Sequence, residues 1–310
     1  MKNMLNGTYA AVLTPRRQTG ELDEARFRAW LAFLIERGIS GFVVNGATGE
    51  FCRTIASEFD RLVAITAEMA CSHAGFLACI GGATSHNAIE MGRTALRRGA
   101  DALLLPMPYF FSYSQSDLSA FCHAVASAVD APILLYNLPQ FASPLEPETS
   151  LRLICECKSI VGIKDSSGSL DTMELLTREN IDACRIIGND QVLSQALEAG
   201  LCDGVVSGVA CVFPELLLAL YACAGQAHGT HFRRLAEVLQ SLLHEIDILP
   251  VPWSLKVLAE CVGLATATFP FPLSPERRRQ KSNLEAWFQE HKGELQPKYP
   301  APAMDPTRGR

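Results

Sequence analysis

The sequence predicts an α/β protein folded as a (β/α)8 TIM barrel with a C-terminal helical extension. Eight short β-rich runs alternate with segments of helical period, and their starts, from Thr8 to Gly204, lie about 28 residues apart on average. Such a step accommodates one strand, one loop and one helix. Gly38, Gly99 and Gly200 each follow a helical segment directly before a strand, where glycine commonly ends a helix. A doubly wound open sheet is the alternative that this alternation leaves open.

The expected elements follow one another in order along the chain. The β-rich runs begin near Thr8, Gly41, Phe76, Asp101, Pro132, Ile160, Cys184 and Gly204. The intervening helices are expected at 24–36, 54–72, 86–98, 117–129, 146–157, 170–177, 191–199 and 214–224. Three further helices are expected at about 228–246, 252–262 and 275–290. We therefore divide the chain into a barrel over 1–225, an extension over 226–293 that serves packing or oligomerisation, and a proline-rich tail over 294–310 that is expected to be disordered.

Composition excludes several functional classes. Apolar residues make up 48% of the 310 residues and charged residues 19%, as in a globular protein with a large core. The net charge of −6 provides no basic stripe, so no nucleic-acid partner is expected. Ser207, Pro214 and Glu215 interrupt the most apolar stretch, which predicts a buried strand and helix and no membrane partner. Eleven scattered cysteines and an N-terminus without a signal-peptide pattern predict a cytoplasmic location.

Lysine usage gives the sharpest indication of chemistry, because the active site of a TIM barrel lies at the C-terminal ends of its strands. Of seven lysines, only Lys164 falls within a predicted strand. Alternation puts Gly162 on the same face, where it is expected to leave room for the long side chain. A lysine whose pKa is lowered by burial condenses with carbonyls to a Schiff base. Position alone does not separate this role from an ion pair with Asp165 or from a lysine extended to solvent at the rim.

Other strand ends supply further candidates. The glycines of the 46–49 turn expose backbone N–H groups suited to a carboxylate or phosphate, although the three-glycine dinucleotide spacing is absent. Tyr136 ends the strand next to that of Lys164, where its phenol could transfer a proton or simply pack in the core. All seven histidines are expected in helices or at the opposite end of the barrel, so no metal site is expected.

Five motifs, taken in order, resemble the dihydrodipicolinate synthase / N-acetylneuraminate lyase family of class I aldolases over roughly residues 5–290. They are Gly46-Ala47-Thr48-Gly49-Glu50, Pro108-Tyr109-Phe110, Tyr136-Asn137-Leu138-Pro139, Gly162-Ile163-Lys164-Asp165 and Gly204-Val205-Val206-Ser207. The resemblance implies that Lys164 forms a Schiff base with pyruvate or the 2-oxo end of a longer substrate, and that Tyr136 is the acid/base. It also implies that the N–H groups of Ala47 and Thr48 hold the substrate carboxylate and that Gly188 and Val206 line the pocket floor. No cofactor is implied, and a homodimer or homotetramer is the expected assembly.

Departures from the family pattern bear on the substrate. Ala47 stands where many members have a hydroxyl residue, and Phe110 stands where a tyrosine from a neighbouring subunit is usual. Gln140 and Phe141 stand where the synthases have a small residue and an arginine that grips the carboxylate of the aldehyde. The strand ends also supply neutral hydrogen-bond donors and acceptors and one carboxylate, which suit a substrate that carries a chain of hydroxyl groups. These groups belong to Ser166, Ser207, Asn189, Asp190 and Gln191.

The leading expectation is therefore a pyruvate-linked class I aldolase that cleaves a 2-oxo-3-deoxy sugar acid or a small hydroxy-oxo acid. The alternative within the enzymes is a 4-hydroxy-tetrahydrodipicolinate synthase, which condenses pyruvate with aspartate semialdehyde. The alternative of another class, motivated by Ala47 and Phe110, is a keto-acid-binding protein on an aldolase scaffold.

Overall fold

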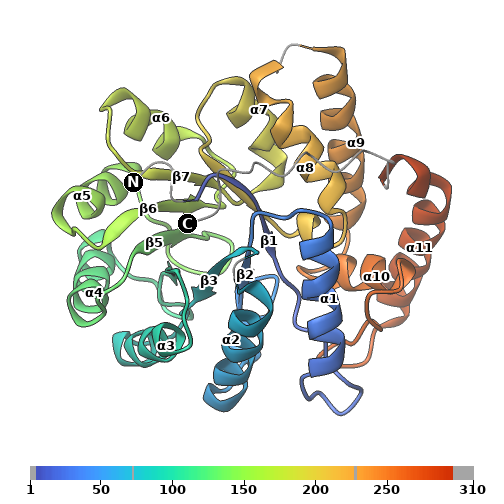
Figure 1. The fold of residues 1–310 in the computed structure, drawn as a ribbon, viewed down its shortest axis with the longest axis horizontal. Helices are drawn as coiled ribbons and strands as arrows, with labels where there is room; N and C mark the ends of the chain where they lie inside the picture. Colours follow the sequence, from blue (N-terminus) through green and yellow to red (C-terminus); the bar gives the residue numbers. More distant parts are fainter. Residues whose placement is uncertain (1–4, 72, 227–228, 296–310) are drawn as a thin grey trace.

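The structure is a computed structural model that describes residues 5–71, 73–226 and 229–295. Eight parallel strands close into one barrel in sequence order, and helices surround it (Figure 1). The predicted TIM barrel with a helical extension is confirmed. The open-sheet alternative is excluded, because the first strand pairs with the last.

The strands and helices alternate without exception through the barrel. The strands are β1 (Gly7–Ala11), β2 (Gly41–Val44), β3 (Gly75–Cys79), β4 (Ala102–Pro106), β5 (Ile133–Asn137), β6 (Ile160–Asp165), β7 (Cys184–Ile187) and β8 (Gly204–Ser207). The helices are α1 (Glu24–Glu36), α2 (Ala56–Ala70), α3 (Ser85–Arg97), α4 (Gln115–Ala128), α5 (Pro147–Glu156), α6 (Asp171–Arg178), α7 (Leu193–Glu198) and α8 (Pro214–Ala222). Helix α7 starts two residues later than expected, because Asp190–Val192 forms a 3-10 turn that the Asn189 side chain caps.

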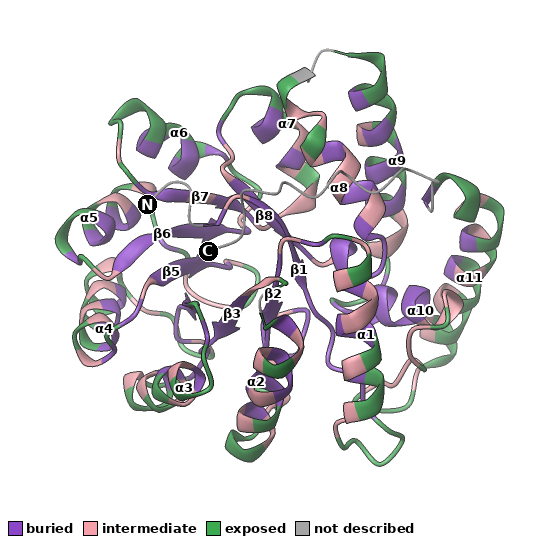
Figure 2. Cartoon of the chain, viewed as in Figure 1, coloured by how far each residue is buried: buried purple, intermediate pink, exposed green. Residues whose placement is uncertain are grey.

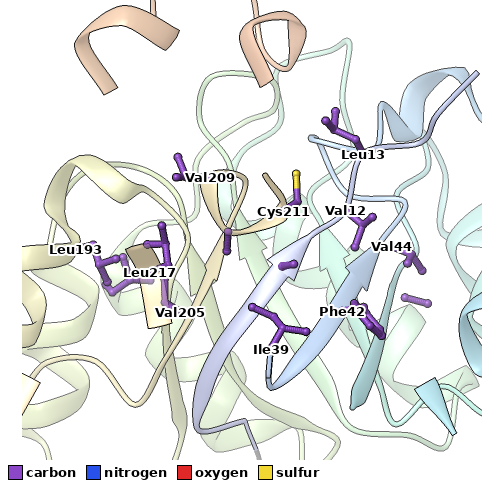
Figure 3. Close-up of a cluster of buried hydrophobic side chains, with 14 of the residues drawn as sticks. Val12, Leu13, Ile39, Phe42, Val44, Leu193, Val205, Val209, Cys211 and Leu217 are labelled. Carbon is purple, nitrogen blue, oxygen red and sulfur yellow. The ribbon is translucent and has the colours of Figure 1, made fainter. Parts of the chain in front are cut away.

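Two apolar layers hold the barrel together. The strands are buried along their lengths, while each surrounding helix exposes its outer face (Figure 2). The inner layer fills the space enclosed by the strands and contains Tyr9, Val43, Leu104 and Ile186. The outer layer lies between strands and helices, and Figure 3 shows part of it, including Phe42, Val44, Val205 and Leu217. Burial of this apolar surface is the main force that holds the helices against the strands.

Strand β6 departs from strict alternation. Ile133 and Leu134 of β5 are adjacent, yet they pair with Ile160 and Gly162, so Val161 forms a bulge. A Cβ at Gly162 would stand 2.2 Å from the Cys184 carbonyl oxygen of β7. Glycine is needed there because the neighbouring backbone approaches closely. The expectation that Gly162 makes room for Lys164 is therefore wrong.

The C-terminal extension consists of α9 (Thr230–Ile246), α10 (Trp253–Cys261) and α11 (Pro275–Leu295). Helix α9 packs beside α8, and α11 packs against α9 and α10 (Figure 1). Phe288 of α11 lies with its ring 6.0 Å from that of Phe213, next to α8. Residues 294 and 295 of the expected tail belong to α11, and the rest of that tail lies outside the described residues. Within the described ranges, none of the helices has both the length and the apolar character needed to cross a membrane.

Candidate active site

Lys164 and Tyr136 lie side by side at the carboxyl ends of β6 and β5. They are paired in register, and the Lys164 Nζ atom lies 3.8 Å from the centroid of the Tyr136 ring. Lys164 is 4% exposed and Tyr136 3%, which excludes a lysine extended to solvent. The Asp165 carboxylate instead accepts hydrogen bonds from the Ser167 amide at 2.7 Å and from the Asn137 side chain at 3.3 Å. The structure thus brings together the two residues expected to carry the chemistry.

Gly188, directly after β7, leaves the space that Lys164 occupies. A Cβ at this position would stand 2.6 Å from the Lys164 Cε atom and 2.3 Å from the Ser166 Oγ atom. The Ser166 hydroxyl is buried and has no hydrogen-bond partner among the described residues. Val206 is buried in the same inner layer as Tyr136. Gly188 and Ser166 therefore border Lys164, while Val206 lies in the same inner layer, and the expectation that Gly188 and Val206 form the pocket floor stays a prediction.

Asp190 and Ser207 form a second polar pair near Lys164. The Ser207 hydroxyl donates to Asp190 Oδ2 at 2.7 Å, while the buried Oδ1 atom has no partner within the described chain. Burial raises the pKa of Asp190 to about 6, and the Ser207 hydrogen bond and the charge of Lys164 partly oppose this rise. The carboxyl group therefore stays protonated to a higher pH than an exposed aspartate does.

The turn after β2 presents backbone donors. Asn45 adopts a left-handed conformation, with φ of 58°, and its side chain donates to the Cys79 carbonyl at 3.0 Å. Glu50 closes the turn, since its amide donates to the Ala47 carbonyl at 3.0 Å. Among the described residues, the N–H groups of Ala47 and Thr48 donate to no acceptor. Two consecutive unused N–H groups at a strand-to-helix turn suit an anionic group such as a carboxylate.

Phe110 and Phe141 do not join this group. They are 85% and 50% exposed and line an open hollow over the loops that follow β4 and β5. Each lies four residues beyond the end of its strand, so the loop carries its ring to the rim of the barrel. Gln140, in contrast, reaches toward β6 and donates to the Ser166 carbonyl at 3.1 Å.

A buried ion pair beside the turn was missed by sequence reasoning. Lys256 of α10 places its Nζ atom 2.5 Å from Glu50 Oε2, and both side chains are less than 10% exposed. The other oxygen, Oε1, accepts from Arg53 at 3.0 Å. Arg53 and Lys256 thus both pair with the one Glu50 carboxylate. The only signal in the sequence was a lysine among the mostly apolar residues of this helix. The expectation that the extension serves packing or oligomerisation did not include this pair.

The described part of the chain contains no group of three or more His, Cys, Asp or Glu side chains that could hold a metal ion. Its histidines lie in helices or in the turn before β3, and His228 lies outside the described residues. The expectation that the site works without a metal or cofactor stays a prediction.

Comparison with known proteins agrees with this architecture. The model of a family described as the dihydrodipicolinate synthetase family matches residues 4–291. A 4-hydroxy-tetrahydrodipicolinate synthase from Thermomicrobium roseum is 32% identical over 273 residues, which cover 88% of this chain and 90% of that protein. One from Nitrosospira multiformis is 32% identical over 287 residues, covering 90% and 93%.

Solved structures show the same likeness. The chloride-inhibited dihydrodipicolinate synthase from Acinetobacter baumannii, complexed with pyruvate, has a TM-score of 0.86 at 26% identity, covering 93% of this chain and 99% of that one. The 4-hydroxy-tetrahydrodipicolinate synthase from Methylacidiphilum fumariolicum has a TM-score of 0.84 at 29% identity, covering 94% and 98%.

Proposed function

This chain belongs to the dihydrodipicolinate synthetase family, a family of Schiff-base lyases, and we propose that Lys164 forms the imine, with pyruvate as its 2-oxo acid. The observation that carries the proposal is the burial of the Lys164 amine 3.8 Å above the Tyr136 ring, at the carboxyl ends of paired strands. A buried primary amine beside a phenol is the pair of groups that imine chemistry needs.

The proposed reaction begins when the Lys164 Nζ atom adds to the C2 carbonyl of pyruvate and water leaves. The resulting protonated imine withdraws electrons from C3. A methyl proton then passes to the Tyr136 oxygen, which has given its own proton to the departing water, and an enamine forms. Carbon C3 of the enamine then attacks an aldehyde, or, in the reverse direction, the C3–C4 bond breaks. The Tyr136 hydroxyl transfers the proton at the reacting oxygen, and the N–H groups of Ala47 and Thr48 bind the pyruvate carboxylate.

For the aldehyde, we propose aspartate semialdehyde, because relatives covering nine-tenths of the chain are named 4-hydroxy-tetrahydrodipicolinate synthase. This reverses the preference drawn from the sequence, where Phe141 in place of an arginine favoured a sugar acid. The comparisons thus support the condensing enzyme better than the sugar-acid lyase.

Cleavage of a 2-oxo-3-deoxy sugar acid is a second candidate, and one observation favours it. The Asp190 carboxyl has a buried, unpartnered oxygen near Lys164, with the Ser207 hydroxyl bonded to its other oxygen. A hydroxylated substrate could donate to that oxygen, whereas the carboxylate of aspartate semialdehyde would be repelled by an ionised Asp190.

Measured kcat/KM values decide between the two candidates. We expect the condensation of pyruvate with aspartate semialdehyde to exceed pyruvate release from 2-oxo-3-deoxy sugar acids by at least ~10-fold, which corresponds to 1.4 kcal/mol. The opposite order would establish the second candidate and remove the first.

The variant Asp190→Asn distinguishes the two candidate reactions by a second, independent measurement. The variant should raise kcat/KM for aspartate semialdehyde, because a neutral amide no longer repels the substrate carboxylate. Since the pKa of Asp190 is about 6, the carboxyl is charged mainly above that pH, so the gain should grow as pH rises from about 5 to about 7.5. A variant that loses activity toward a sugar acid and gains none with the semialdehyde would favour the lyase. Asp130→Asn, at an exposed carboxylate, controls for the lost charge.

We also propose that the chain forms a homodimer or homotetramer. Phe110, Phe111 and Phe141 are exposed together around one hollow, at 85%, 65% and 50%. Contact between subunits would remove this apolar surface from water.

A further inference from the structure

Lys256 is a buried lysine that the proposed chemistry does not use. It lies on α10, is 6% exposed, and donates to Glu50 Oε2 at 2.5 Å and to the Thr268 carbonyl at 3.0 Å. A buried ammonium group is costly unless it is paired and hydrogen-bonded, and these partners meet that need. The pair joins the C-terminal extension to the turn after β2.

Glu50 is the residue on which the geometry of that turn depends. It adopts a left-handed conformation, with φ of 57°, which is unfavourable for a residue with a side chain. Its amide holds the Ala47 carbonyl, and its two carboxylate oxygens are held by Lys256 and Arg53. The ionic contacts therefore stabilise a strained backbone directly beside the unused N–H groups of Ala47 and Thr48.

A second contact joins the same helix to the turn. A Cβ at Gly208, just after β8, would stand 2.9 Å from the Leu255 Cδ1 atom and 3.3 Å from the Thr48 Oγ1 atom. Leu255 of α10 and Thr48 of the turn therefore both lie against Gly208. Leu255 and Lys256 are neighbours on α10, so the same part of this helix packs on Gly208, beside Thr48, and pairs with Glu50.

We propose that Lys256 is a positioning residue through which the C-terminal extension holds the carboxylate-binding turn, and so sets the affinity for the 2-oxo acid. The identity of that acid as pyruvate rests on the proposed function. Without Lys256, Glu50 would keep a buried charge with one partner fewer, and the strained turn would relax. Lys164 lies on β6 and Tyr136 on β5, which are other elements of the barrel, so their chemistry should persist once the acid is bound.

Lys256→Met should raise the KM for pyruvate by at least ~10-fold while kcat changes by less than about 3-fold. The pyruvate concentration that half-saturates borohydride trapping should rise in parallel, because trapping reports occupancy of the imine. Lys256→Arg, which keeps the charge, should restore most of the affinity. Glu50→Gln, which keeps the shape of the side chain and removes its charge, should reproduce the loss of affinity for pyruvate. It takes the place of Lys256→Met if that variant does not fold.

Lys281→Met is the matched control. Lys281 of α11 is also partly buried and contacts Glu260 and Glu285, but it does not touch the turn. It should lower the unfolding temperature and leave the KM for pyruvate unchanged. If Lys256→Met and Glu50→Gln lose only stability, as Lys281→Met does, the positioning role is wrong. If the unaltered protein traps no pyruvate at all, the proposed function fails instead.

Discussion

Lys164→Met should lower turnover by roughly 10⁵-fold or more, the scale of loss when an enzyme's covalent nucleophile is removed. Methionine has a similar length and no amine, so the variant can bind the 2-oxo acid and cannot form an imine. Methionine also fills nearly the same space among the buried side chains, so the fold should be kept. Steady-state rates with pyruvate and aspartate semialdehyde measure the loss.

Lys158→Met is the control for this variant. Lys158 is exposed and precedes β6, at the end of the strand opposite to Lys164. It should retain full activity. Equal losses in both variants, or a Lys164→Met enzyme within about 100-fold of the unaltered one, would remove Lys164 from the mechanism.

Tyr136→Phe should lower kcat by about 10²–10⁴-fold, the usual contribution of a positioned general acid or base. Phenylalanine keeps the ring beside the Lys164 amine and removes only the hydroxyl, so imine formation should survive in part. The exchange of pyruvate methyl protons in deuterated water follows proton transfer without requiring an aldehyde. It should slow along with turnover.

Tyr221→Phe removes an equivalent hydroxyl at the opposite end of the barrel, where it contacts the Gly7 amide and the Asp203 carbonyl. This variant should change the stability of the fold more than it changes the rate of methyl-proton exchange. Unchanged exchange in Tyr136→Phe would show that another group carries the proton. If even the unaltered protein forms the imine and exchanges no protons, it is a keto-acid-binding protein.

The barrel could be predicted from the sequence because its signal repeats. Eight strand–helix steps of similar length identify the fold even when a boundary is displaced by one or two residues, as at α7. Lys164 could be predicted for a related reason, since it is the one lysine within a β-rich run. Tyr136 followed from its place at the end of the neighbouring strand, and pairing in register brings the two together.

Features that depend on contacts between distant parts of the chain could not be predicted from the sequence. Strict alternation predicted that Gly162 leaves the space for Lys164, because a one-residue bulge leaves no mark in the sequence. Gly188, directly after the next strand, provides that space instead. The partners Glu50 and Lys256 are 206 residues apart, so neither residue indicates the other. Phe110 and Phe141 lie exposed at the rim, four residues beyond their strands, and the contact with substrate expected for them stays a prediction.

Borohydride reduction in the presence of pyruvate, followed by digestion and mass spectrometry, shows whether Lys164 forms the imine. Reduction of the imine converts it to a stable secondary amine and leaves a 1-carboxyethyl group on the lysine that formed it. We expect one such group per chain, on the peptide that contains Lys164, and none in Lys164→Met. A label on Lys158 or Lys256, or no label at saturating pyruvate, would contradict this expectation.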